Sequence, residues 1–140
     1  MLLNIPFWIK NPLSPPQLVS WVLLFSSITL VILGLYFLSA RGAPDDSAGR
    51  PENYSFENTT RLVTAGPYKY IRHPMYSSLL LLAWGALIKH ITIYGSVVVL
   101  IETALLVMTA KKEESENILL FGSPYEEYIK KTKMFIPWLF

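Results

Sequence analysis

Six polar side chains that could do chemistry lie in two short stretches, and each stretch borders an apolar segment. They are Tyr68, Arg72, His73 and Tyr76 in the first stretch, and Glu113 and Glu114 in the second. The first stretch offers cations, hydroxyls and aromatic faces, and the carboxylates of the second accept hydrogen bonds from a sugar diol or an ammonium group. This mixture suits the binding of a zwitterionic, nucleoside-containing ligand better than it suits hydrolysis.

The composition argues against several other kinds of site. The chain has no cysteine, which excludes disulfides, thiolate metal sites and cysteine nucleophiles. It has two histidines, His73 and His90, which we expect on opposite faces of a membrane, so we predict neither a metal site nor a Ser-His-Asp arrangement. The net charge of +2 is small and no basic stripe with interleaved aromatic residues is present, so we expect no nucleic-acid partner.

Three apolar runs must position these polar groups, and they predict an integral membrane protein. Hydrophobic residues make up 52% of the chain and charged residues 16%, which is too apolar for an ordinary soluble domain of 140 residues. The runs cover residues 18–38, 75–88 and 91–110. At about 1.5 Å per residue, the first crosses a hydrocarbon core of about 30 Å, whereas the second is short when taken alone. Glu102, inside the third run, is an intramembrane acid and therefore a functional suspect.

The order of these runs predicts how the two polar stretches meet. Lys89 and His90 lie between the second and third runs and read as a tight turn that joins an antiparallel helical hairpin. The outer ends of such a hairpin lie side by side, so the first polar stretch should meet the glutamate pair. After the third run, we expect helix up to Phe121 and a second short helix over 125–131, because a Gly-Ser-Pro step interrupts the pattern. The expected fold is all-α, one multi-pass membrane domain over 1–140 with about three spans.

Charge placement predicts the orientation of the spans. Ten of the twelve lysines and arginines lie in the loop 39–74 or after Ala110, and the other two are Lys10 and Lys89. This positive-inside bias predicts that the loop and the tail face the cytoplasm, and that the polar site faces it too.

Two motifs in this polar region resemble a known family. "LVTAGPYKYIRHPMY", followed some 40 residues later by "EESENILLFGSPYEEYIKKTKMFIP", is similar to the isoprenylcysteine carboxyl methyltransferase family, whose members are integral membrane enzymes that use S-adenosylmethionine. The resemblance covers residues 53–137. Phospholipid and small-thiol methyltransferases look similar in these motifs. The motifs are therefore quite specific to the superfamily but less specific to one methyl acceptor.

The resemblance implies a set of cofactor-binding positions and S-adenosylmethionine as the cofactor. These positions are Asn53, Thr60, Arg61, Leu62, Val63, Tyr68, His73, Pro74, Met75, Tyr76 and Glu113. We expect catalytic roles for Arg72, His73 and Glu114. A carboxylate or thiolate acceptor needs no general base, whereas an amine must lose a proton, for which Glu114 or His73 is a candidate.

One departure from the family pattern concerns the acceptor. Prenylcysteine methyltransferases carry an arginine a few residues before the glutamates, and Thr109 stands there in this chain. Lys111 and Lys112 could pair with a carboxylate, but as point charges and not as a bidentate fork. We predict a lipid-like acceptor in the bilayer, with a prenylated cysteine carboxylate first and a phospholipid or small thiol as the alternative. A homo-oligomer is also compatible with a bundle of about three spans.

Plainer interpretations of the same residues stand beside this one. Arg72 and His73 could be cations snorkelling at the start of a helix, and the two glutamates could be a solvated helix face paired with lysines. We expect Tyr125 and Tyr128 to pack the tail helix against the membrane face. A non-catalytic helical protein that assembles with a partner or binds lipid is the alternative of another class.

Overall fold

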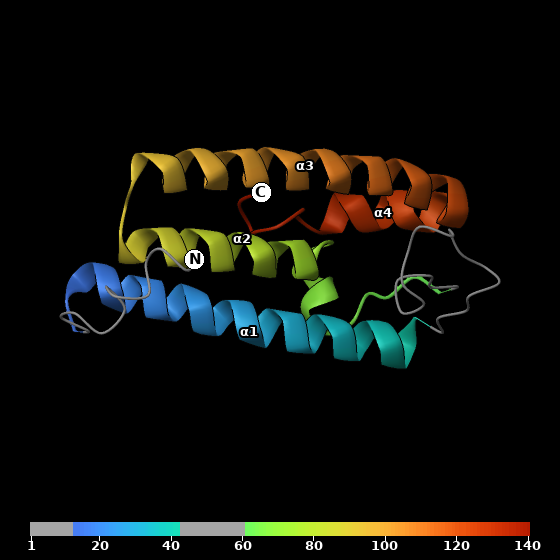
Figure 1. Cartoon of the computed structure of the whole chain (residues 1–140). Helices are drawn as coiled ribbons and strands as arrows, with labels where there is room; N and C mark the ends of the chain where they lie inside the picture. The colour runs from blue at the N-terminus through green and yellow to red at the C-terminus, as the bar shows by residue number, and fades with distance from the viewer. Residues whose placement is uncertain (1–12, 43–60) are drawn as a thin grey trace.

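The computed structural model describes residues 13–42 and 61–140, and this part of the chain is all-α (Figure 1). Its elements in chain order are α1 (Pro15–Arg41), the 3₁₀ helix η2 (Gly66–Lys69), α2 (Pro74–Lys89), α3 (Ile93–Phe121) and α4 (Ser123–Lys131). The expectation of an all-α fold is confirmed for these residues. Asn53 and Thr60 lie outside the described residues.

Two of the three predicted apolar runs form helices long enough to cross a membrane. They are α1, with 27 residues, and α3, with 29. α2 has 16 residues, which corresponds to about 24 Å and is shorter than a hydrocarbon core of about 30 Å. α3 runs on past the predicted span because good helix formers follow Ala110 and no breaker occurs before Gly122, whose φ of 65° ends the helix.

Small and polar residues hold α1 against α2. Ser20 and Ser27 are buried on one face of α1. The Ser20 hydroxyl donates to the carbonyl oxygen of Gly85 at 2.6 Å, and that of Ser27 donates to the carbonyl oxygen of Ser78 at 2.7 Å. Small residues let helix backbones approach closely, and hydrogen bonds across the contact stabilise it in lipid, where apolar side chains gain nothing by leaving their surroundings. The opposite face of α1 is apolar and exposed, including Phe25 and Ile32, as a lipid-facing surface requires.

α2 and α3 form the predicted antiparallel hairpin. α2 ends at Lys89, and α3 starts after Thr92, whose hydroxyl accepts a hydrogen bond from the backbone N–H of Gly95 at 3.1 Å. This N-cap satisfies one of the free N–H groups of the first turn. Because α2 is shorter than its neighbours, it starts part-way along the bundle, and the end of α1 and the last turns of α3 extend past it (Figure 1).

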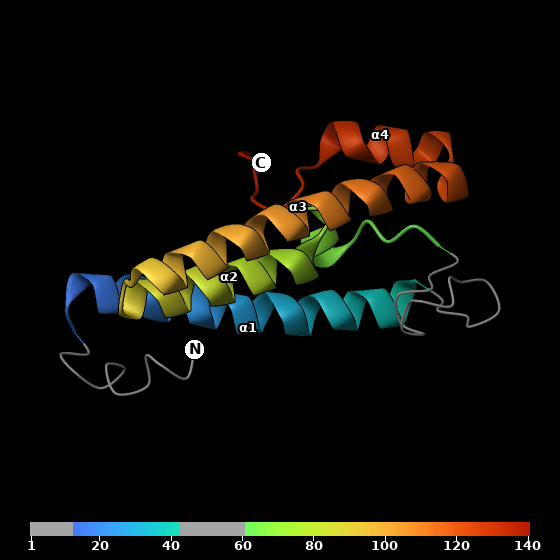
Figure 2. The same cartoon turned by 45° about the horizontal axis from the view of Figure 1, so that its top comes forward.

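The segment after α4 turns back toward the start of α2 (Figure 1). Figure 2 shows α4 lying along the last turns of α3. The chain then pairs with the loop before α2: the N–H of Arg72 donates to the carbonyl oxygen of Lys133 at 2.8 Å, and the N–H of His73 donates to that of Met134 at 3.1 Å. Met134 and Phe135 are buried against Ala110 of α3. These bonds fix the backbone of Arg72 and His73 relative to α3.

Candidate functional site

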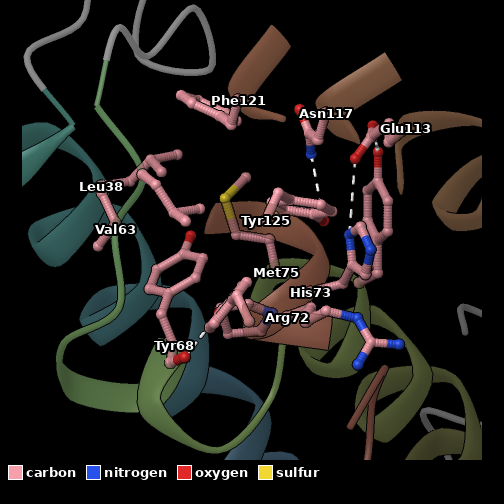
Figure 3. A pocket seen from close by; sticks show the side chains of 14 residues that line it. Leu38, Val63, Tyr68, Arg72, His73, Met75, Glu113, Asn117, Phe121 and Tyr125 are labelled. Atoms are coloured by element: carbon pink, nitrogen blue, oxygen red, sulfur yellow. Dashed lines mark hydrogen bonds and ion pairs between the residues drawn. The ribbon is translucent and has the colours of Figure 1, made fainter. Parts of the chain in front are cut away.

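A cavity of about 130 Å³ opens beside the start of α2 (Figure 3). Side chains from the four α-helices, from η2 and from the loop before α2 surround it. They are Leu38, Leu62, Val63, Tyr68, Arg72, His73, Pro74, Met75, Tyr76, Glu113, Asn117, Phe121, Tyr125 and Tyr128. The wall therefore combines aromatic rings and aliphatic side chains with a carboxylate, an amide and an imidazole.

Most of the residues expected at the cofactor or catalytic site line this cavity. Those that do are Leu62, Val63, Tyr68, Arg72, His73, Pro74, Met75, Tyr76 and Glu113. Glu114 lies behind the wall, where it contacts Arg72 and His73. Arg61 is exposed and is not among the lining residues.

His73 lies between the two glutamates. Its Nδ1 is 3.6 Å from Oε2 of Glu113, and its Nε2 is 3.3 Å from Oε1 of Glu114. The ring of Tyr76 stacks on the imidazole with centroids 5.5 Å apart and planes 4° apart, and its hydroxyl donates to Oε1 of Glu113. The structure thus brings together the two polar stretches that are about 40 residues apart in sequence.

The Arg72 guanidinium is bound by protein groups from α3 and from the end of α4. Its Nε is 2.5 Å from Oε1 of Glu114, and its Nη1 donates to the carbonyl oxygens of Thr132 at 2.6 Å and Ile129 at 3.3 Å. The guanidinium therefore ties α3 to the end of α4. This geometry favours a role for Arg72 in holding Glu114 and His73 in place.

The cluster shifts the pKa values of its members in opposite directions. Burial disfavours the protonated form of His73 and is the largest contribution, but the hydrogen bonds and charges of Glu113 and Glu114 together outweigh it and raise the pKa of His73 above 6.5. Burial likewise pushes the pKa of Glu114 upward, yet His73 and Arg72 outweigh it, and that pKa falls below 4.5. The arrangement favours an imidazolium between two carboxylates.

Several lining residues were not predicted as site residues. Asn117 and Phe121 follow Glu113 by four and eight residues on α3, and helical spacing places them on the same face, so the sequence did contain a signal for them. The Asn117 amide donates to the hydroxyl of Tyr125 at 3.3 Å. Tyr125 is buried as expected for a packing residue, and it also lines the cavity. Leu38 comes from α1, and no sequence spacing places it there.

The donor set fits a nucleoside linked to an amino-acid zwitterion. Tyr68, Tyr125 and Phe121 offer aromatic faces for a base, and Glu113 offers acceptors for a diol or an ammonium group. Phe121 and Tyr125 lie with ring centroids 6.2 Å apart, which forms a continuous aromatic wall. Within residues 13–42 and 61–140, no group of three or more histidine, cysteine or acidic side chains is arranged to hold a metal ion.

A second, larger cavity of about 590 Å³ has a wall that is partly exposed, and we call it the apolar chamber. Its wall comes from α1, α2, α3, the segment around η2 and the chain after α4. The lining residues are Leu23, Leu30, Pro67, Tyr70, Ile71, Ser77, Leu80, Leu81, Trp84, Thr103, Val107, Phe135, Ile136, Pro137 and Phe140. Phe135 lines the chamber, and its ring packs on that of His73, which lines the first cavity, with centroids 6.0 Å apart.

Comparisons with known proteins agree with the motifs. The family model described as phospholipid methyltransferase matches residues 17–120. The chain is 27% identical over 118 residues, 84% of its length, to methanethiol S-methyltransferase 1 of Bradyrhizobium diazoefficiens, and 32% identical over 72 residues, 51% of its length, to methanethiol S-methyltransferase of Pseudomonas deceptionensis. It spans only 39% and 27% of those relatives' lengths. No solved structure matches the chain significantly.

Proposed function

Since the chain belongs to the phospholipid methyltransferase family, we propose that it is an integral membrane methyltransferase that uses S-adenosylmethionine as its methyl donor. The observation that carries this proposal is the placement of His73 between Glu113 and Glu114, in the wall of a cavity with aromatic faces. The cavity lies where the apolar helices end, which is where a water-soluble cofactor can meet an acceptor from the bilayer.

Each part of the cavity has a proposed task in holding the donor. Glu113 accepts hydrogen bonds from the donor, and Tyr76 and His73 hold the Glu113 carboxylate in place. Tyr68 and Met75 complete the wall on the side of α1 and α2. The resemblance adds Asn53, Thr60 and Arg61 to the proposed cofactor site.

The donor, when bound, supplies a methyl carbon already activated by a sulfonium. The protein then has to align the acceptor with that carbon and keep water away. Phe135, between the cavity and the apolar chamber, is placed to exclude water from that side. We propose that the apolar part of the acceptor lies in the chamber and its reactive atom reaches the region of His73.

The first candidate acceptor is the carboxylate of a prenylated cysteine, as the motifs imply. A thiol is the second candidate, and two observations favour it. Thr109, Lys111 and Lys112 are exposed and outside both cavities, and Arg72 is held by Glu114 and by backbone carbonyls. The curated relatives are named as methanethiol S-methyltransferases. A thiolate requires no guanidinium fork, whereas a carboxylate acceptor benefits from one.

A transfer assay with three acceptor classes tests this function. Protein in lipid nanodiscs is supplied with methyl-labelled S-adenosylmethionine and, separately, with a farnesylcysteine analogue, an alkanethiol or phosphatidylethanolamine. We expect labelled product from at least one class, and a loss of at least tenfold in Glu113→Gln. Glu127→Gln, at an exposed position of α4, is the matched control. Absence of product from all three classes would contradict the proposed function.

A further inference from the structure

We propose that Trp84, positioned by Thr103, closes the far end of the apolar chamber and limits the acceptor's apolar part to a chain shorter than one membrane leaflet. The ligand class is an amphiphile with a thiol head and a short apolar tail. This inference rests on the proposed function, because it deepens the choice of acceptor.

At the near end of the chamber, the lining residues Ser77 and Phe135 contact His73. The hydroxyl of Ser77 is 2.9 Å from the carbonyl oxygen of His73 and 2.8 Å from that of Phe135. Phe135 itself packs its ring on the imidazole of His73. The walls of the chamber and of the first cavity are therefore in contact at His73, and we propose that a tail in the chamber places its head group there.

Side chains from three helices line the far end of the chamber. The indole N–H of Trp84 on α2 donates to the hydroxyl of Thr103 on α3 at 3.3 Å. That hydroxyl in turn donates to the carbonyl oxygen of Val99 at 2.7 Å, which fixes its orientation. Leu23 of α1 also lines this end of the chamber.

The helix packing just beyond Trp84 leaves no room for the chamber to continue between α1 and α2. A Cβ atom added to Gly85 would lie only 3.1 Å from Cβ of Leu23 and 3.2 Å from Cδ2 of Leu24. The Ser20 hydroxyl also donates to the carbonyl oxygen of Gly85 at 2.6 Å. The two helices are therefore in direct contact one residue past the indole.

The position of Trp84 sets a length. Ser77 and Trp84 are seven residues apart on α2. At 1.5 Å per residue this is about 10 Å, whereas one leaflet of the hydrocarbon core is about 15 Å thick. A tail that ends at the indole is therefore shorter than a phospholipid acyl chain, and a longer tail must bend out between the helices. This favours a short-tailed thiol over a phospholipid as the acceptor.

Photo-crosslinking tests this inference without methyl transfer. A series of S-alkyl thioethers of increasing tail length, each with a diazirine at the tail end, is added to protein in nanodiscs, and labelled residues are mapped by mass spectrometry. For one short tail length, we expect labelling at Leu23, Trp84 and Thr103 that the same thioether without the diazirine competes away. The range of tail lengths that gives saturable labelling is the length profile. In Trp84→Ala, it should extend to longer tails, and in Thr103→Val it should broaden.

Trp21→Ala is the matched control, because it removes an indole that does not line the chamber. It should leave the length profile unchanged. Labelling that cannot be competed and is confined to lipid-facing residues such as Phe25 and Ile101 would overturn the proposal, and so would an unchanged profile in Trp84→Ala. The proposed function has a separate readout. If it is wrong, the protein will not bind S-adenosylhomocysteine, whatever the labelling pattern.

Discussion

At the residue scale, the cluster of Arg72, His73, Glu113 and Glu114 depends on mutual compensation of charge. Each member is at least partly buried, and removal of one partner leaves a charge that water cannot fully solvate. The same contacts that orient His73 and Glu113 for binding therefore also stabilise the fold at this end of the bundle.

Glu114→Gln should destabilise the protein strongly. The side chains of Arg72 and Glu114 are 8% and 14% exposed, and breaking such a pair costs about 3 kcal/mol. We expect a lower melting temperature in detergent. Glu127→Gln breaks an exposed pair with Lys131 and should cost at most about 1 kcal/mol. Equal effects of the two substitutions would show that the buried cluster is not stabilising.

The raised pKa of His73 predicts a loss of stability at alkaline pH. A raised pKa contributes stability that is fully present below the unfolded value of 6.5 and is lost as pH rises through the folded value. The lowered pKa of Glu114 contributes stability that is present above 4.5 and is lost as pH falls through its folded value. Melting temperatures measured across pH should therefore decline on the alkaline side because of His73 (the alkaline limb) and on the acid side because of Glu114 (the acid limb).

His73→Gln is the variant that tests the alkaline limb. It should remove the decline in stability that begins above pH 6.5, and it should weaken the acid limb, because His73 helps to lower the pKa of Glu114. An unchanged alkaline decline in His73→Gln would assign that decline to another group.

At the element scale, the 3₁₀ helix η2 carries Tyr68 into the cavity and depends on one glycine. Gly66 has φ of +60°, which favours glycine, and an added Cβ would lie 2.4 Å from the ring of Phe37 on α1. Tyr128 of α4 donates to the carbonyl oxygen of Tyr68 at 2.6 Å, so a displaced η2 would also disturb α4.

Gly66→Ala should therefore destabilise the protein by more than the roughly 1–2 kcal/mol of the left-handed conformation alone. The excess comes from the contact with Phe37. In a Phe37→Ala background, Gly66→Ala should therefore cost less stability than it does in the wild type. A double-mutant cycle of melting temperatures measures this difference. Strict additivity would mean that the ring simply moves aside.

The sequence predicted the elements well where a local signal exists. Residues 75–88 form α2 with one extra residue at each end, and the break at Gly122 separates α3 from α4 as expected. α3 continued to Phe121 because the helical pattern does not change where the apolar run ends. Pairing of the segment after α4 with the loop at Arg72 and His73 could not be predicted, because it depends on contacts about 60 residues apart.

At the scale of the whole molecule, the distribution of lysine and arginine implies one orientation. We propose that the cavity faces the cytoplasm, since the ends of α1 and α3 and the start of α2 share the basic side. The two short polar stretches were recognisable from their residue types. The apolar chamber was not, because its wall combines residues from α1, α2, α3 and the chain after α4 that only the assembled bundle brings together.

Single cysteines test the orientation, because the chain has none of its own. Ile91→Cys is in the exposed turn between α2 and α3, and Glu127→Cys is on the exposed face of α4. In intact cells, a membrane-impermeant maleimide should label the first, and should label the second only after permeabilisation. The reverse pattern would contradict a cytoplasmic site.

The central claim is that the cavity around His73 and Glu113 binds S-adenosylmethionine. Calorimetric titration of S-adenosylhomocysteine into the purified protein tests it most directly, with His73→Ala as the site variant and Glu127→Gln as the control. We predict micromolar binding by the wild type and the control, and loss of binding by His73→Ala in a protein that stays helical. Equal binding by the wild type and His73→Ala, or no binding by a folded wild type, would contradict the claim.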